Sequence, residues 1–380
     1  MHPFSETLFH PLLPAAAGPA AKLLLLTAGA GFFLGSPATA GLPAVEFPGP
    51  EWRTAAPGIQ GVDAAKLAAA MDYLASVCGP AGVHETVVVR NGVILWQGDR
   101  VRHRNVIWSC TKSFLSTCLG LLWDDGKCAP ADFAWKYFPE LKADYPAVTL
   151  EQLATFTSGY DCPDGQPLKP MPPMYKPGTA MHYSAQSDLL AAILTRIAGE
   201  SLESLFMRRI GREIGLTGES FRWDSRGTLD GIPLNGGSGF PGSGVQCSAL
   251  GLARFGWFYA NGGCWNGKRL ISRRYLDYAT VPRVPPTLPP HEPNGWYKVL
   301  PGSYGLNWWV NGTTPQGRRM WPHAPAATFA AQGNNNAICF VVPDWNLVII
   351  RLGNDLVIDT DLYDGMFARL GLGEPADVRR

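Results

Sequence analysis

A serine and a lysine three positions apart are the residues of this sequence best placed to do chemistry. Ser109 and Lys112 open an apolar run that ends near Asp124, and their spacing puts both side chains on one face of a helix. A lysine amine beside a serine hydroxyl can accept the hydroxyl proton when burial or a neighbouring charge lowers the pKa of the amine. The serine oxygen could then attack an acyl group. A Ser-x-x-Lys pair is common by itself, so the rest of the chain decides its meaning.

The composition is that of a globular protein. The chain has 380 residues, 46% of them hydrophobic and 17% charged, which suits one large unit or two closely joined domains. The formal net charge is +1 and no basic stripe alternates with aromatic residues, so nucleic acid is not an expected partner. The cysteines form no Cys-x-x-Cys pair and no cluster with metal-ligand spacing, and we expect no metal or organic cofactor.

Residues 1–40 have the features of a secretory signal. Lys22 precedes an apolar stretch that reaches Leu34, and the small-residue sequence Ala38-Thr39-Ala40 follows. The stretch is shorter than the about 20 residues that a membrane-spanning helix needs, so we expect no span in the mature protein. We therefore predict a periplasmic or secreted protein. The alternative is a cytoplasmic protein whose N-terminus is extended by a mis-assigned start codon.

The elements that must position Ser109 and Lys112 follow from hydrophobic periodicity and turn residues. Asp63 is suited to cap a helix that runs to Val77. Asn91-Gly92 between two β-rich runs predicts a hairpin of residues 86–90 and 93–97. Further helices are expected over residues 149–155, 187–198, 249–261 and 359–370, and further strands over residues 303–310, 337–342 and 347–352.

Strands are thus expected at both ends of the chain, with helices and long loops between them. This order predicts an α+β fold, in which an antiparallel sheet built from both chain ends is flanked by helices. We expect residues 41–127 and 300–380 to form the sheet domain and residues 128–299 to form an inserted, mainly helical domain. Together the two would make one catalytic unit.

Two later segments complete a pattern that begins with Ser109 and Lys112. Tyr183-Ser184-Ala185 follows a Pro-Gly turn, and Ala331-Gln332-Gly333-Asn334 forms a glycine turn just before an expected strand. In this order and at these separations, the three segments resemble the motifs of the serine β-lactamase-like hydrolases. That family includes class C β-lactamases, D-alanyl-D-alanine carboxypeptidases, esterases and 6-aminohexanoate-dimer hydrolases. The resemblance covers roughly residues 50–370 and implies the β-lactamase/transpeptidase-like fold.

The resemblance also implies a role for each motif residue. Ser109 would be the nucleophile that forms an acyl-enzyme, with Lys112 and Tyr183 as general base and acid; which of the two is the primary base stays open. The backbone N–H groups of Ser109 and Asn334 would form the oxyanion hole. Gln332 and Gly333 would contact the substrate.

Two departures from the family pattern narrow the expected activity. In the lactamases the third motif is Lys-Thr-Gly, and its lysine helps to hold the substrate carboxylate; here Ala331 stands in that position. Ala185 replaces the asparagine that contacts the acylamino side chain. A site without these two groups should bind a penicillin poorly, while its acylation chemistry is intact.

We therefore expect a serine hydrolase that cleaves a small-molecule ester or amide. One alternative is a D-Ala-D-Ala carboxypeptidase or β-lactamase. An alternative of another class is a non-catalytic ligand-binding or sensor protein that keeps the fold. The acyl group, the leaving group and the oligomeric state are not predicted.

Overall fold

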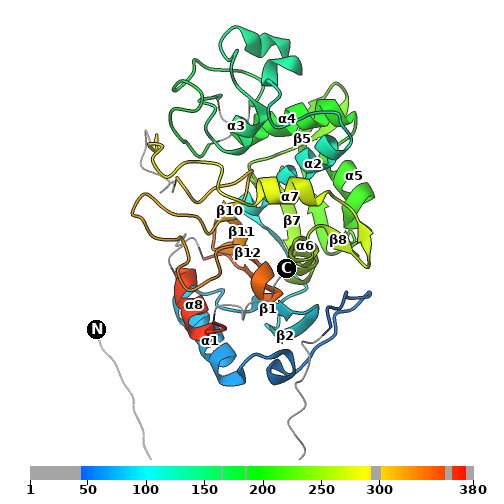
Figure 1. Cartoon of the computed structure of the whole chain (residues 1–380). Coiled ribbons are helices and arrows are strands. Elements are labelled where there is room, and N and C mark those ends of the chain that lie inside the picture. The colour runs from blue at the N-terminus through cyan, green and yellow to red at the C-terminus, as the bar shows by residue number, and fades with distance from the viewer. Residues whose placement is uncertain (1–43, 164–165, 185, 292–300, 356–361, 374–380) are drawn as a thin grey trace, which may run out of the picture. The chain divides into compact units, whose positions relative to one another are not determined.

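A six-stranded antiparallel sheet lies at the centre of the fold (Figure 1). The computed structural model describes residues 44–163, 166–184, 186–291, 301–355 and 362–373, and residues 42–380 form one compact unit. The strands of the sheet are, in spatial order, β10 (Trp309–Val310), β11 (Phe329–Gly333), β12 (Ala337–Val342), β13 (Leu347–Leu352), β1 (Glu85–Arg90) and β2 (Val93–Gln97). Strand β1 pairs with β13, with Val88 opposite Ile349. The predicted sheet of both chain ends is therefore confirmed.

Helices from distant parts of the chain flank this sheet or lie beyond one end of it (Figure 1). Their bounds are α1 (Ala64–Val77), α2 (Thr111–Asp124), α3 (Leu150–Ala154), α4 (Gln186–Ala198), α5 (Leu202–Phe206), α6 (Ala249–Ala260), α7 (Arg273–Ala279) and α8 (Leu362–Leu370). No helix within the described ranges is long and apolar enough to cross a membrane. The expected signal at residues 1–40 falls outside those ranges.

The two faces of the sheet are buried in two different hydrophobic clusters. Val87 and Val89 of β1 join the cluster that contains α2 and α6, whereas Val88 joins the cluster that contains α1 and α8. The alternation arises because successive side chains of a strand point to opposite faces. Since both faces are covered, the strands are mostly apolar, and β12 and β13 are buried along their whole length.

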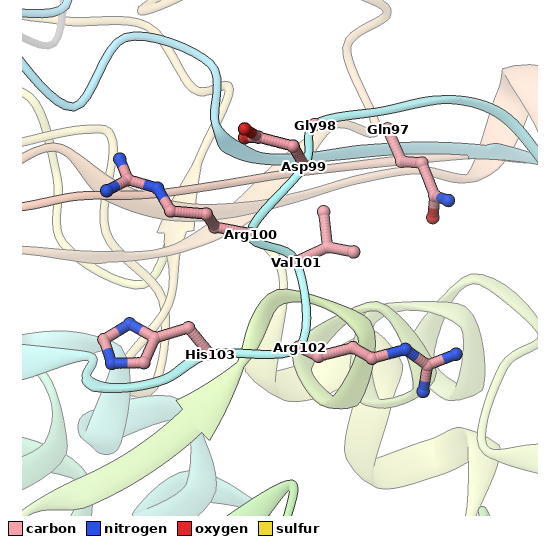
Figure 2. A pocket seen from close by; sticks show the side chains of 7 residues that line it. All are labelled: Gln97, Gly98, Asp99, Arg100, Val101, Arg102 and His103. Atoms are coloured by element: carbon pink, nitrogen blue, oxygen red, sulfur yellow. The ribbon is translucent and has the colours of Figure 1, made fainter.

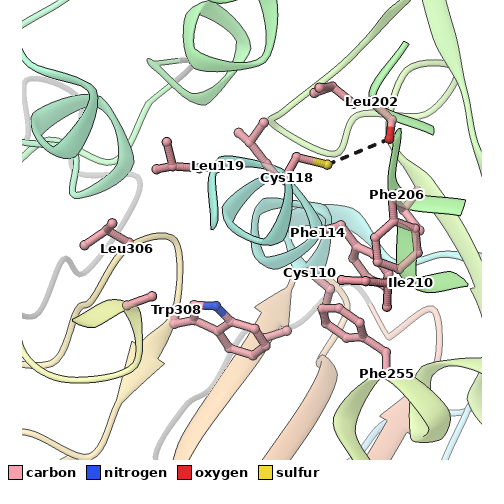
Figure 3. Packing of buried hydrophobic residues seen from close by; sticks show 14 of the residues in the cluster. Cys110, Phe114, Cys118, Leu119, Leu202, Phe206, Ile210, Phe255, Leu306 and Trp308 are labelled. Atoms are coloured by element: carbon pink, nitrogen blue, oxygen red, sulfur yellow. Dashed lines mark hydrogen bonds between the residues drawn. The ribbon is translucent and has the colours of Figure 1, made fainter. Parts of the chain in front are cut away.

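Helix α2, which begins just after Ser109, is buried on all sides. Its residues from Thr111 to Leu122 are all buried, and Phe114 stacks on Phe255 of α6 with the ring centroids 4.0 Å apart. Figure 3 shows Cys110, Phe114 and Cys118 of this segment among side chains of α5 and α6. A helix enclosed in this way has little freedom to shift, because protein interiors are close-packed. It therefore provides a rigid support for the residues at its N-terminal end.

Local signals predicted several elements correctly. Asp63 caps α1 by accepting hydrogen bonds from the N–H groups of Ala65 and Lys66. Asn91 and Gly92 have positive φ angles of 50° and 87°, as the two central residues of a tight hairpin require. The short helix α3 begins with a reciprocal capping box between Thr149 and Gln152.

Other expected elements differ in the structure. The strand expected over residues 303–310 is reduced to Trp309–Val310, because the chain reverses at Asn307, whose φ is 55°, and Tyr304 bridges back to Trp309. Residues 331–333, expected in a turn, belong to β11, and the turn itself is Asn334–Asn336. Short strands that the sequence did not indicate are β3 (Arg104–Val106), β4 (Phe221–Trp223), β5 (Ser225–Leu229), β6 (Ile232–Asn235), β7 (Val245–Ser248), β8 (Cys264–Trp265) and β9 (Lys268–Arg269).

Contacts between elements cross the expected boundary between the sheet domain and the inserted domain. Helix α6 falls within residues 128–299, yet it packs on β12, β13 and β1 of the sheet. Strand β3, before the boundary, pairs with β7, after it. The division into two domains stays a prediction, while their union in one unit agrees with the packing.

Candidate active site

The candidate nucleophile lies in a strained turn at the N-terminal end of α2. Ser109 is the middle residue of a 3-10 turn formed by Trp108–Cys110, and it is half-buried. Trp108 has a φ of 50°, a left-handed backbone conformation that is uncommon for a bulky residue and is often found at functional sites. The turn therefore aims Ser109 out of the regular helix, where its hydroxyl stays within reach of solvent.

Lys112 contacts Ser109 as the three-residue spacing predicts. The Lys112 Nζ atom lies 2.9 Å from Ser109 Oγ and 2.9 Å from the carbonyl oxygen of Ser238. The lysine side chain is 3% exposed. The amine is therefore anchored by a backbone carbonyl and directed at the serine hydroxyl.

Burial sets the protonation state of this amine. Removal from water disfavours the ammonium form and lowers the pKa of Lys112 to about 7, although the negative charge of Asp188 opposes this effect. Near neutral pH a large fraction of the amines is thus unprotonated. In that form the nitrogen lone pair can accept the Ser109 proton, which an ordinary surface lysine cannot do.

Tyr183 lies beside Lys112 and packs among other aromatic rings. The Lys112 Nζ atom is 4.8 Å from the centroid of the Tyr183 ring. The ring packs on Phe156, at a centroid distance of 4.4 Å, and is nearly parallel to that of Trp309 at 6.0 Å. The structure brings the second motif to the first, and the part of Tyr183 in proton transfer stays a prediction. Ala185 lies outside the described residues.

Strand β11 brings the third motif against the nucleophile turn. A Cβ atom on Gly333 would lie 2.3 Å from the carbonyl oxygen of Ile107 and 2.9 Å from the Ser109 nitrogen. Only glycine allows such a close approach of two backbones. Asn334 is the next residue after this close approach, and its place in the oxyanion hole stays a prediction. Gln332 is buried, and its Oε1 atom accepts no hydrogen bond from the described part of the chain.

Gly333→Ala should push the third motif away from the turn that carries the nucleophile. The added methyl group cannot fit between β11 and the Trp108–Cys110 turn, so the two must separate and the N–H of Asn334 must move with the strand. We expect turnover of an activated ester to fall by about 100-fold, the usual effect of losing one oxyanion donor. Steady-state kinetics will measure this loss. Gly58→Ala is a control for the loss of a glycine, since Gly58 has no positive φ and no atom lies within 4 Å of its Cβ position. Equal losses in both variants would contradict the prediction.

Sequence reasoning missed the loop that holds Lys112. The glycine-rich segment of residues 236–244 passes over the nucleophile turn, and Gly239, with a φ of 87°, lies so close that a Cβ would be 2.0 Å from the carbonyl oxygen of Trp108. The carbonyl of the preceding residue, Ser238, accepts the hydrogen bond that Lys112 Nζ donates. The glycine content was the available signal, because close backbone approach needs glycine.

Asp188, in the first turn of α4, was also missed. Its Oδ1 atom accepts hydrogen bonds from the backbone N–H groups of Gly237, at 2.7 Å, and Ser238, at 2.8 Å. It therefore fixes the carbonyl that binds Lys112. Nothing in the local sequence distinguishes this aspartate from an ordinary residue of a helix N-terminus.

Asp188→Asn should shift the pH dependence of acylation. The negative charge of Asp188 raises the pKa of Lys112 against the effect of burial, so its removal lowers that pKa further. We expect the rising limb of kcat/KM against pH to move to lower pH by a few tenths of a unit up to about one unit. A pH–rate profile will measure the shift. Asp230→Asn, a change at an exposed ion pair with Arg196, should leave the profile in place, and an unmoved profile in Asp188→Asn would exclude this electrostatic link.

One surface pocket is lined by residues 97–103, which connect β2 to β3 (Figure 2). It presents Arg100, Arg102 and His103 but none of the three motifs. Within the described ranges no group of three or more His, Cys, Asp or Glu side chains is arranged to hold a metal ion.

Comparison with known proteins agrees with this geometry. A family model described as Beta-lactamase matches residues 81–372. A 6-aminohexanoate-dimer hydrolase of Paenarthrobacter ureafaciens is 25% identical over 261 residues, which are 57% of this chain and 62% of that protein. The chain thus spans less than two thirds of that relative.

Solved structures show the same fold at low identity. A D-alanine carboxypeptidase from Burkholderia cenocepacia superposes with a TM-score of 0.58 at 20% identity, over 81% of this chain and 99% of that one. A family VIII carboxylesterase superposes with a TM-score of 0.57 at 17% identity, over 82% and 97% of the two chains. The match to the family model, over most of the chain, and the shared fold lead to one conclusion: the chain belongs to the β-lactamase family of serine hydrolases.

Proposed function

We propose that this protein hydrolyses a small ester or amide through an acyl-enzyme on Ser109. The observation that carries the proposal is the 2.9 Å contact between Ser109 Oγ and the Nζ atom of Lys112, a buried amine with a pKa of about 7. A nucleophile and a base in hydrogen-bond contact, with the base anchored by a third group, form the arrangement that nucleophilic catalysis requires. Here the carbonyl of Ser238 is that third group.

The acylation step follows from the positions of these groups. Lys112 accepts the proton of the Ser109 hydroxyl as the oxygen attacks the acyl carbon. The N–H groups of Ser109 and Asn334 stabilise the negative oxygen of the tetrahedral intermediate. When the intermediate collapses, the bond to the leaving group breaks, and Lys112, with Tyr183, returns the proton to the departing alcohol or amine.

Deacylation uses the same groups with water as the nucleophile. Lys112 or Tyr183 accepts a proton from water as the water oxygen attacks the acyl carbon. The carboxylic acid departs, and Ser109 recovers its proton. Water thus supplies one hydroxyl to the acyl product and one proton overall to the leaving group.

The substrate class is proposed from the chemistry of the third motif. Ala331 is 1% exposed and offers no cation to a substrate carboxylate. Aromatic rings surround the site instead, from Phe156, Tyr183 and Trp309. These features favour an uncharged ester or amide over a β-lactam or a D-Ala-D-Ala peptide. The names of the carboxylesterase and of the 6-aminohexanoate-dimer hydrolase agree with an ester or a linear amide as the bond that is cleaved.

A substrate panel combined with active-site labelling tests the proposal. The purified protein is treated with a fluorophosphonate probe, the labelled peptide is mapped by mass spectrometry, and turnover is measured with p-nitrophenyl acyl esters, a linear amide dimer, nitrocefin and a D-Ala-D-Ala peptide. We expect the label on Ser109 and the fastest turnover on esters or the amide. Faster turnover of nitrocefin or of the peptide would favour the lactamase or carboxypeptidase alternative. Binding without acyl transfer would favour the non-catalytic alternative.

A further inference from the structure

The turn that carries Asn334 has an unusual backbone. Gly333 pairs with Ala337 across the hairpin of β11 and β12, and the N–H of Ala337 donates to the carbonyl of Asn334 at 3.2 Å. The two central residues, Asn335 and Asn336, both have left-handed backbones, with φ angles of 61° and 56°. A two-residue turn of this kind fits the twist of a hairpin, but it places two non-glycine residues in a sparsely populated conformation.

Both carbonyl groups at the centre of this turn are held from behind by buried side chains. Arg351 of β13 donates from Nη1 to the carbonyl of Asn335 at 3.0 Å. Tyr363 of α8 donates from its hydroxyl to the carbonyl of Asn336 at 2.7 Å. The side chain of Arg351 is fully buried and Tyr363 is 1% exposed. Burial raises the pKa of Tyr363 well above its ordinary value, so its hydroxyl keeps the proton that it donates.

Arg351 is itself fixed by partners outside the turn. It forms a fully buried ion pair with Asp355, and its Nε donates to the carbonyl of Gly82 at 3.0 Å. Asp355 in turn accepts a hydrogen bond from the N–H of Ala81 at 3.2 Å. A buried ion pair costs desolvation energy and adds little net stability compared with apolar residues. Its presence behind this turn suggests that it serves the geometry of the turn.

We propose that Arg351 and Tyr363 are positioning residues that hold the Asn334–Asn336 turn so that the N–H of Asn334 faces the carbonyl oxygen of the substrate. This inference rests on the proposed function, because it assigns the oxyanion donor to Asn334. The two residues act only by holding backbone carbonyls of the turn, and they do not contact the substrate. The contact of Gly333 with the Ser109 nitrogen then sets the separation of the two oxyanion donors.

Tyr363→Phe is the sharpest test, because it deletes one hydroxyl and keeps the ring in its contact with Phe340. We expect kcat for a p-nitrophenyl ester to fall by about tenfold with KM changed less than about twofold, since an oxyanion donor that is displaced but not deleted should cost less than the about hundredfold loss of a deleted one. Affinity for an arylboronic acid, whose adduct with Ser109 mimics the tetrahedral intermediate, should weaken by a similar factor. If the Tyr363 hydrogen bond only stabilised the fold, its loss would leave kcat and the boronate affinity near the parent values.

Tyr275→Phe is the matched control. The hydroxyl of Tyr275 is also buried and donates to a backbone carbonyl, that of Ser116, at 2.6 Å, away from the turn. It should lower the melting temperature as much as Tyr363→Phe does, while kcat and boronate affinity stay at the parent values. Parent-like kcat and boronate affinity in Tyr363→Phe, with Ser109 labelled normally in the parent, would overturn this inference alone. A parent protein with neither label nor turnover would overturn the proposed function and this inference with it.

Discussion

Ser109→Ala protein is expected to lose ester turnover by about four orders of magnitude or more and to give no fluorophosphonate adduct. The hydroxyl oxygen of Ser109 is the atom that the proposed mechanism bonds to the acyl group, and no neighbouring group replaces it. Removing the nucleophile of a serine hydrolase leaves the residual catalysis that comes from binding and the oxyanion hole. Stopped assays of p-nitrophenyl ester hydrolysis and mass spectrometry of the treated protein will measure both effects.

Ser113→Ala is the appropriate control for this variant. Ser113 lies one turn further along α2, is buried, and donates to the carbonyl of Asn307 at 2.9 Å. Its loss should lower stability by about 1 kcal/mol and leave labelling at Ser109. A fluorophosphonate adduct of equal yield in Ser109→Ala and the parent would mean that another residue is the nucleophile.

Lys112→Met is expected to inactivate the enzyme and to stabilise the fold. Without the amine, the Ser109 hydroxyl loses the base that lies 2.9 Å from it, so we expect kcat/KM to fall by about 1,000-fold, within the usual range for a general base. In the parent, kcat/KM should rise with pH through about pH 7, because the active form of Lys112 is the neutral amine and burial lowers its pKa to about 7. The variant should lack this rise. A pH–rate profile of both proteins will measure it.

The effect on stability follows from the same pKa. The amine of Lys112 has a pKa near 10.5 when exposed and about 7 in the fold. Below pH 7 it is charged in both states, and the fold bears the full cost of burying the charge, on the order of 5 kcal/mol. Between pH 7 and 10.5 the unfolded chain binds more protons, so the stability of the parent rises with pH.

Lys112→Met removes the cost of burying the charge. It also loses the hydrogen bonds of the amine to Ser109 and Ser238, and this loss should offset about 1–3 kcal/mol of the gain in stability. The variant should therefore be more stable than the parent at pH 6, and the difference should shrink as pH approaches 10. Urea unfolding at several pH values will show it. Lys136→Met, at an exposed pair with Asp132, should give a small effect that changes little with pH. A Lys112→Met protein that is less stable than the parent at pH 6 would contradict the conclusion that burying the charged amine destabilises the fold.

Much of the fold could be predicted because its signals are local. The Asn91-Gly92 turn, the Asp63 cap and the reciprocal cap of Thr149 and Gln152 each act over four residues or fewer. The apolar strands 337–342 and 347–352 could be recognised because both faces of the sheet are covered. The short strands β3, β4 and β7 could not, because they exist only through pairing with distant segments: β3 pairs with β7 across more than 100 positions, and β4 pairs with β7 across more than 20. The reversal at Asn307 likewise depends on a distant partner, the carbonyl of Ala154.

The sequence by itself determined which groups could react. The spacing of Ser109 and Lys112 puts both on one side of a helix, and the order of the three motifs identifies the family before any coordinate is known. The tertiary structure decided whether the amine can act as a base. Burial of Lys112 and the charge of Asp188 set the protonation of the amine, and the carbonyl of Ser238 anchors it. Asp188 and Ser238 both lie more than 70 residues away along the chain. Desolvation and charge act through space, so no pattern along the chain contains them.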